Sequence, residues 1–218
     1  MRRIRIPTCI AAVAAVIIIL GPSTAPASRL SFLPNHKFVA TSRAIRVEAE
    51  GRILAECPLT LEGEYTFNNV DVEREGREGA AEALAIVRSA TVGTCGVGTF
   101  RFLPAIFPFN VAFVGWLGGN PLVEPERVTG MLWFMWNVGF LISETLSSCL
   151  YTGHIGVLKH LEWSAINRLL VENGTWELLA AGAFLTLRET LAGVCFRERI
   201  NLIGNFTSSP TYAWQFAR

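Results

Sequence analysis

Histidine is the residue type in this sequence best suited to proton transfer or metal binding, and it occurs at positions 36, 154 and 160. His36 lies in a segment that we expect to be flexible. A Ser–His–acid triad would therefore use His154 or His160, with Glu144 or Glu162 as the acid. No Gly-x-Ser-x-Gly pattern marks a nucleophilic serine, and His154, His160 and Glu162 do not follow the spacing of a helical metal site. We predict no catalytic residue, metal ligand or cofactor, and a secreted hydrolase is kept as an alternative.

Aromatic residues near the C-terminus could bind a ligand by stacking. Tyr212, Trp214 and Phe216 alternate with Ala213 and Gln215, which places three rings on one face of a strand. Such a row forms part of a core, a platform for sugar rings, or a band in contact with lipid. We expect these three rings to form part of the core, with ligand stacking and lipid contact as the alternatives.

Four cysteines outside the N-terminal segment predict two disulfides. Cys57, Cys95, Cys149 and Cys195 form an even set, whereas Cys9 belongs to a segment that we expect to be removed. Their spacing favours pairing of the first with the second and the third with the fourth. A zinc site needs closely spaced pairs, which are missing here.

The N-terminus has the order of features found in secretory signals. Arg2, Arg3 and Arg5 precede an apolar run over residues 6–20, and Ala25-Pro26-Ala27 has the small-x-small pattern of a cleavage site. The run has about 15 residues, fewer than the roughly 20 of a spanning helix. We therefore predict a signal peptide over residues 1–27, a flexible N-terminus over 28–37, and one β-rich domain over 38–218. The expected location is extracellular, including the cell surface, and an uncleaved anchor is the alternative.

The charge balance gives no electrostatic reason to expect nucleic acid as a partner. The formal net charge of +1 falls to −2 once the three arginines of the signal are removed. The chain has no basic run of the kind that binds nucleic acid. Asp71 is its only aspartate, so it has no Asp-based calcium loop. The cell envelope and carbohydrate remain as candidate partners, and membrane contact stays open.

Short alternating stretches predict a mainly β fold. Residues 44–50 and 59–62 alternate between apolar and polar side chains, and Gly51-Arg52 stands where a hairpin would turn. We expect an antiparallel β-sandwich or distorted barrel with one or two short helices. Residues 73–91 and 157–187 lean towards helix by composition, and both remain open because pairing overrides propensity.

Residues 102–142 are the most apolar part of the chain. Residues 102–123 and 128–143 contain no charged side chain. The prolines and paired glycines of the first stretch disfavour a spanning helix. We favour a protein core here, and an integral or peripheral membrane protein that uses residues 102–142 is the alternative.

Three motifs together resemble a known group of proteins. They are Cys57-Pro58-Leu59-Thr60-Leu61-Glu62-Gly63, Thr94-Cys95-Gly96-Val97-Gly98, and Pro108-Phe109-Asn110-Val111. The chain resembles small secreted proteins of unassigned function from high-GC soil actinobacteria, in which the last motif usually reads Pro-Trp-His-Val. The resemblance implies a mostly β secreted domain with cysteine pairs and a strand at residues 80–91, and it implies no activity. We therefore expect a non-enzymatic binding or structural protein, extracellular or in the cell envelope.

Overall fold

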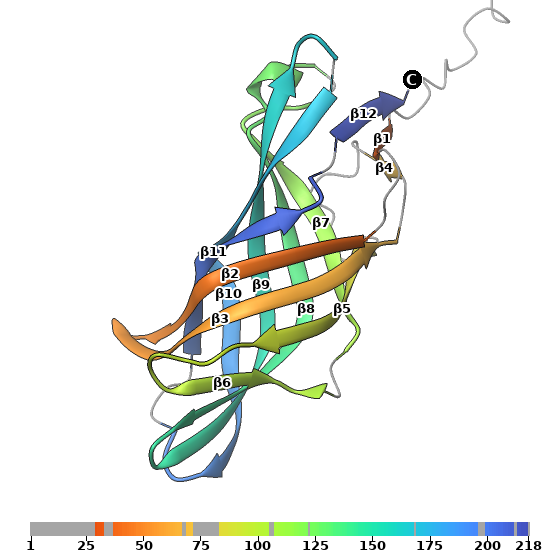
Figure 1. Cartoon of the computed structure of the whole chain (residues 1–218). Coiled ribbons are helices and arrows are strands. Elements are labelled where there is room, and N and C mark those ends of the chain that lie inside the picture. Colours follow the sequence, from red (N-terminus) through yellow and green to blue (C-terminus); the bar gives the residue numbers. More distant parts are fainter. Residues whose placement is uncertain are drawn as a thin grey trace, which may run out of the picture.

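The protein forms a single antiparallel sheet that closes into a ring (Figure 1). This computed structural model describes residues 29–32, 37–66, 69–71, 83–104, 107–121, 123–167, 169–195, 199–211 and 213–217. The sheet has 12 strands in the order β11-β2-β3-β5-β7-β8-β9-β10-β12-β1-β4, with β6 paired to β8. The mainly antiparallel β fold, predicted as a sandwich or a distorted barrel, is confirmed.

The ring closes because β11 pairs with both β10 and β2. Its eight strands are β2 (Lys37–Ala49), β3 (Arg52–Tyr65), β5 (Ala83–Val92), β7 (Phe109–Leu117), β8 (Gly130–Glu144), β9 (Ser147–Ser164), β10 (Leu169–Ala192) and β11 (Arg199–Ser209). Each is hydrogen-bonded to the ring strand that precedes it and to the one that follows. Figure 1 shows β2, β3 and β11 on the near side and β7, β8 and β9 on the far side.

The core fills the inside of this ring because inward and outward side chains alternate along each strand. On β2, for example, Phe38 and Ala40 are buried whereas Val39 and Thr41 are exposed. The largest fully buried side chains come from six of the eight ring strands: Trp133, Trp176, Tyr151, Phe38, Phe140, Lys159, Phe206, Ile45, Leu61 and Met131. Residues 102–142 contribute three of these.

At one end of the ring, β6 (Thr99–Phe102) replaces two shorter neighbours. The strands β5 and β7 lie between β3 and β8. The last residue of β5 stands opposite Leu59 of β3, and β7 begins opposite Val87 of β5, so neither strand extends along the first residues of β3. There Val97 bridges to Glu56 of β3, and β6 pairs with β8 from Thr99 to Phe102. The wall is thus completed by a segment that the cysteine at position 95 ties to β3.

Both expected disulfides are present and lie at this end. Cys57 of β3 is bonded to Cys95 in the loop before β6, across a sequence separation of 38. Cys149 of β9 is bonded to Cys195 just after β10, across a separation of 46. In the chain-entropy model, closing loops of this length stabilises the fold by roughly 4 kcal/mol each.

Three short strands extend the sheet at the other end of the ring. They are β1 (Arg29–Phe32), β4 (Asn69–Asp71) and β12 (Ala213–Ala217), and β12 joins them to the first residues of β10. β1 belongs to the N-terminus that we expected to be flexible, and it pairs with β12 on one side and with β4 on the other. The predicted signal peptide lies outside the described residues.

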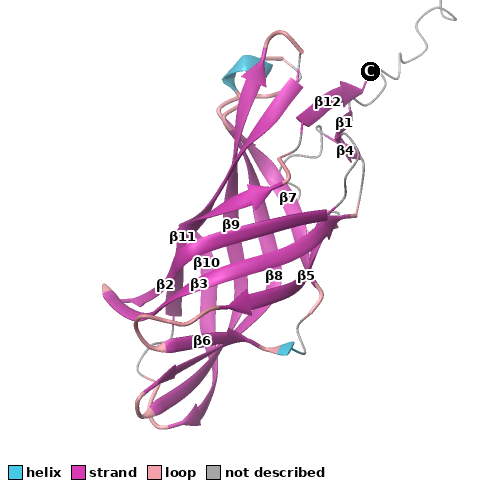
Figure 2. Cartoon of the chain, in the orientation of Figure 1, coloured by secondary structure: helices cyan, strands magenta, loops and turns pink. Residues whose placement is uncertain are grey.

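The choice between helix and strand, which the sequence left open for residues 157–187, falls to strand, because these residues lie in β9 and β10 (Figure 2). Each of these strands is hydrogen-bonded on both sides, and inward positions such as Val157 and Leu161 are buried at a spacing of two along the strand. Pairing therefore overrides helix propensity. Within residues 73–91, the described part is β5, while residues 73–82 lie outside it.

Helix is limited to short turns among the described residues, such as the 3-10 helix η2 (Pro125–Arg127) between β7 and β8. None of the described helices has the length and hydropathy that crossing a membrane requires.

Candidate functional site

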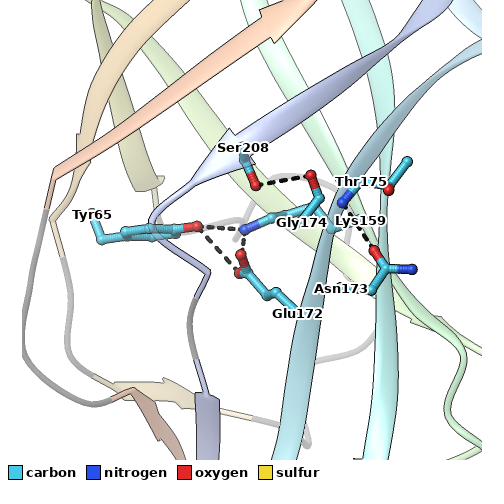
Figure 3. Close-up of polar contacts among 7 residues, drawn as sticks. All are labelled: Tyr65, Lys159, Glu172, Asn173, Gly174, Thr175 and Ser208. Atoms are coloured by element: carbon cyan, nitrogen blue, oxygen red, sulfur yellow. Dashed lines mark hydrogen bonds and ion pairs between the residues drawn. The ribbon is translucent and has the colours of Figure 1, made fainter.

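A charged cluster lies inside the ring, close to the end opposite the disulfides. It consists of Lys159 on β9, Glu172 on β10 and Tyr65, the last residue of β3 (Figure 3). The Lys159 ammonium donates hydrogen bonds to a Glu172 carboxylate oxygen and to the Tyr65 hydroxyl oxygen. The Tyr65 hydroxyl in turn donates to Glu172 at 3.3 Å. Because Tyr65 comes from across the ring, the cluster links strands that are not neighbours in the sheet.

Aromatic rings surround the ammonium group of Lys159. Its Nζ atom lies 4.2 Å from the ring centroid of Trp133, 4.7 Å from that of Trp176 and 5.0 Å from that of Tyr65. Phe38 completes the box, with its centroid 5.1 Å from Trp176 and 5.4 Å from Tyr65. Strand register positions part of this box, since Trp176 stands directly opposite Lys159 on the neighbouring strand. Cation–π attraction thus adds to the ion pair.

Burial governs the electrostatics of this cluster. The side chains of Lys159 and Glu172 are 0% and 2% exposed. Desolvation lowers the pKa of Lys159 from 10.5 to about 8, and the attraction of Glu172 offsets only part of that effect. A lysine with such a pKa could act as a nucleophile if a substrate reached it. Here the side chains that contact the ammonium are themselves buried, so we interpret the cluster as a structural link.

A cleft opens at the end of the ring that carries the disulfides, and we call it the disulfide-end cleft. Its volume is about 240 Å³. Its walls are Arg52, Leu54, Ile142, Glu144, Ser147, Cys149, Tyr151, Val194 and Cys195. A second hollow of about 420 Å³ adjoins it, because the two share Arg52, Leu54 and Glu144. Together they offer a space of the size that small ligands occupy, roughly 300–1,000 Å³.

The disulfides and two glycines hold the loops that form the walls of this cleft. Gly98, next to the Cys57–Cys95 bridge, has a φ of +51°, and a Cβ atom there would collide with the Leu54 carbonyl oxygen. Gly193, two residues before Cys195, has a φ of +65°, and a Cβ atom there would collide with the Leu146 carbonyl oxygen. Only glycine fits both the left-handed backbone and the close approach. The walls are therefore held to the ring by covalent bonds and by tight backbone contacts.

The cleft combines an apolar floor with a charged rim. Leu54, Ile142 and Tyr151 are 8%, 3% and 2% exposed and face inward. At the rim, the Arg52 guanidinium lies 3.6 Å from a Glu144 carboxylate oxygen, with side chains 66% and 28% exposed. An ion pair this long and this exposed is weak. Arg52 can therefore exchange Glu144 for an anionic group of a ligand.

The histidines considered for catalysis, His154 and His160, lie on the outside of the ring. The ring of His154 lies 5.3 Å from that of Phe134 and 5.1 Å from that of Trp136. His160 contacts Glu177 at 3.3 Å rather than either carboxylate considered from the sequence. No group of three metal-binding side chains occurs in the part of the chain that is described.

The predicted stacking residues are only partly described. Tyr212 lies outside the described residues. The backbones of Trp214 and Phe216 belong to β12, where they stand opposite Phe32 and Leu30 of β1. Ligand stacking by these rings therefore stays a prediction.

Sequence reasoning missed both the charged cluster and the cleft. The signal for the cluster was a lysine at an inward position, since Lys159 alternates with Val157 and Leu161. The cleft left no local signal, because its walls come from segments far apart in the sequence.

No protein-family model, curated protein or solved structure matches this chain.

Proposed function

We propose that this protein is a secreted, non-enzymatic binding domain of the extracellular medium or cell envelope, and that it holds a small ligand in the disulfide-end cleft. The observation that carries the proposal is the cleft, which has an apolar floor, the exposed Arg52 at its rim, and walls held in place by the two disulfides. The mouth of a closed β structure is a common place for a ligand site. The predicted signal peptide and the two disulfides support an oxidising destination.

Binding is favoured over catalysis by the groups that the cleft contains. Its hydroxyl groups belong to Ser147 and Tyr151, and neither His154 nor His160 contributes to its walls. Close by, the hydroxyls of Ser143 and Ser148 lie 3.1 Å apart and hydrogen-bond to each other. A hydroxyl nucleophile needs a base within hydrogen-bond reach, and the carboxylate among the lining residues, Glu144, is paired with Arg52. The resemblance to actinobacterial secreted proteins stays a prediction, and it too implies no activity.

The lining residues favour a compact ligand with an apolar portion and one carboxylate. Leu54, Ile142 and Tyr151 would cover the apolar portion, for which burial contributes about 25 cal/mol per Å². The Arg52 guanidinium would bind the carboxylate with two parallel hydrogen bonds. Glu144 would then move away from Arg52, at little cost because the present ion pair is long and exposed.

The proposal can be tested by NMR titration of the disulfide-bonded protein. The probes are short-chain and aromatic carboxylic acids, each compared with its primary amide. We expect the acids to shift resonances of cleft residues, and Arg52→Gln to weaken acid binding at least fivefold while amide binding stays the same. Arg46→Gln is the matched control, since Arg46 also pairs with a glutamate at 2.6 Å but on the outer face.

Two outcomes would contradict the proposal. In the first, no probe shifts a resonance of the cleft walls. In the second, Arg52→Gln and Arg46→Gln change acid binding by the same factor.

A further inference from the structure

The second hollow beside the disulfide-end cleft has a different lining, and we call it the hydroxyl-lined hollow. Its volume is about 420 Å³. Thr99, Ser143 and Thr145 bring hydroxyl groups to its walls. Ile53 and the exposed Val97 bring apolar surface. This hollow therefore offers hydrogen-bonding groups beside a small apolar surface.

The strand β8 contributes successive residues to the two spaces. Ile142, which is buried inside the ring, lines the cleft but not the hydroxyl-lined hollow. Ser143, the next residue, lines the hydroxyl-lined hollow but not the cleft. Because successive side chains of a strand point to opposite faces, the cleft lies on the inner side of the wall and the hydroxyl-lined hollow on its outer side. Arg52 and Glu144 line both, so their ion pair stands where the two spaces meet.

We propose that the ligand of the cleft is a glycoside of a uronic acid, a sugar that carries a carboxylate, and that its sugar ring occupies the hydroxyl-lined hollow. This inference rests on the proposed function, because the apolar portion stays on the floor of the cleft and the carboxylate stays on Arg52. It adds the chemical class of the rest of the ligand. A sugar has hydroxyl groups around its edge and C–H groups on its faces, so hydroxyl and apolar side chains placed together match it.

Glu144 also favours a ligand that is rich in hydroxyl groups. When a ligand carboxylate binds Arg52, the carboxylate of Glu144 loses a partner that now lies 3.6 Å away. An ionised carboxylate only accepts hydrogen bonds, so it needs donors close by. Sugar hydroxyls in the hydroxyl-lined hollow would supply those donors, because Glu144 is one of its lining residues. A simple apolar acid has no such groups to offer.

NMR titration of the disulfide-bonded protein with three probes tests the proposal. Phenyl β-D-glucuronide carries the apolar group, the sugar and the carboxylate, whereas phenyl β-D-glucoside lacks the carboxylate and benzoate lacks the sugar. We expect the glucuronide to bind about tenfold more tightly than either of the other two, a difference of about 1.4 kcal/mol. Thr99→Val should weaken glucuronide binding by about threefold or more, as expected for the loss of one hydrogen bond, and should leave benzoate binding unchanged.

Thr41→Val is the matched control for Thr99→Val. Both threonines are exposed, and the hydroxyl of each donates to a main-chain oxygen at 3.4 Å. Thr41 lies on β2 and lines neither space, so its substitution should leave glucuronide binding unchanged. Thr145→Val is the second variant of the hydroxyl-lined hollow, and thermal melts establish which variants remain folded.

The outcomes separate this inference from the proposed function. If benzoate shifts resonances of the cleft walls but the glucuronide binds no more tightly, the sugar is wrong and the cleft remains a ligand site. A glucoside that binds as tightly as the glucuronide would likewise overturn the uronic acid. So would folded Thr99→Val and Thr145→Val proteins that bind the glucuronide as tightly as the Thr41→Val protein does. If none of the three probes shifts a resonance of the cleft walls, the inference fails together with the proposed function.

Discussion

Lys159→Met tests how the buried ion pair stabilises the ring. Methionine fills most of the volume of lysine, so the substitution removes the charge while it leaves little cavity. The Glu172 carboxylate, whose side chain is 2% exposed, would then be buried without its cation. Breaking a buried pair in this way usually costs about 3–5 kcal/mol. The contacts of the ammonium with three aromatic rings are lost as well, so we expect a loss towards the upper end of that range.

The double variant Lys159→Met/Glu172→Leu separates the cost of an unpaired charge from the value of the pair. Replacing both partners of a buried ion pair by apolar residues is often neutral or stabilising. We expect the double variant to recover most of the stability that Lys159→Met loses. The control is Lys37→Met, which changes the only other lysine of the chain at an exposed position. Its effect should stay within about 0.5 kcal/mol.

Urea unfolding with the disulfides intact, followed by circular dichroism, measures these free energies. The parent, the single variants Lys159→Met and Glu172→Leu, and the double variant form a cycle whose coupling energy should reach at least about 2 kcal/mol. A value near zero would show that Lys159 and Glu172 do not depend on each other. A Lys159→Met protein as stable as the Lys37→Met control would refute the assigned burial of the cation.

Three further outcomes follow from the structure. Because the pKa of Lys159 is about 8 in the fold and 10.5 when the chain is unfolded, the unfolded state binds more protons between these values. The contribution of Lys159 to the free energy of unfolding should therefore rise between pH 8 and 10.5, by an amount on the order of 3 kcal/mol. Urea midpoints measured over this pH range, and compared with those of the double variant, should show the increase. Gly98→Ala should lower the melting temperature clearly, whereas Gly96→Ala, with open space around its Cβ position, should change it little. Serine at both Cys149 and Cys195 should cost about 4 kcal/mol in urea unfolding, and a loss below 1 kcal/mol would contradict the stabilising role of that bridge.

Local patterns in the sequence were enough to predict the class of fold and its covalent links. The alternation in residues 44–50 corresponds to β2, because a strand exposes and buries successive side chains. The order of the four cysteines predicted the bonded pairs, since the nearest partners along the chain were also the partners in space. Both features depend on short or simple sequence relationships.

The same reasoning left the choice between helix and strand open where composition and pairing disagreed. Residues 157–187 contain good helix formers, yet they form two of the longest strands, β9 and β10. Ladders on both sides of each strand supply hydrogen bonds and buried contacts that outweigh a helix preference of a few tenths of a kcal/mol per residue. Which preference wins depends on neighbours in the sheet, and those neighbours come from elsewhere in the chain.

The sequence by itself thus determined that this is a β protein with two disulfides, whereas the tertiary structure decided where its candidate sites lie. Lys159 meets Tyr65 only because the ring closes and brings β3 across from β9. Arg52 and Cys195 share one cleft because the first residues of β3 and the segment after β10 lie at the same end of the ring. The physical reason is that strand pairing joins distant segments, so the surroundings of each side chain are set by register and closure rather than by its neighbours in sequence.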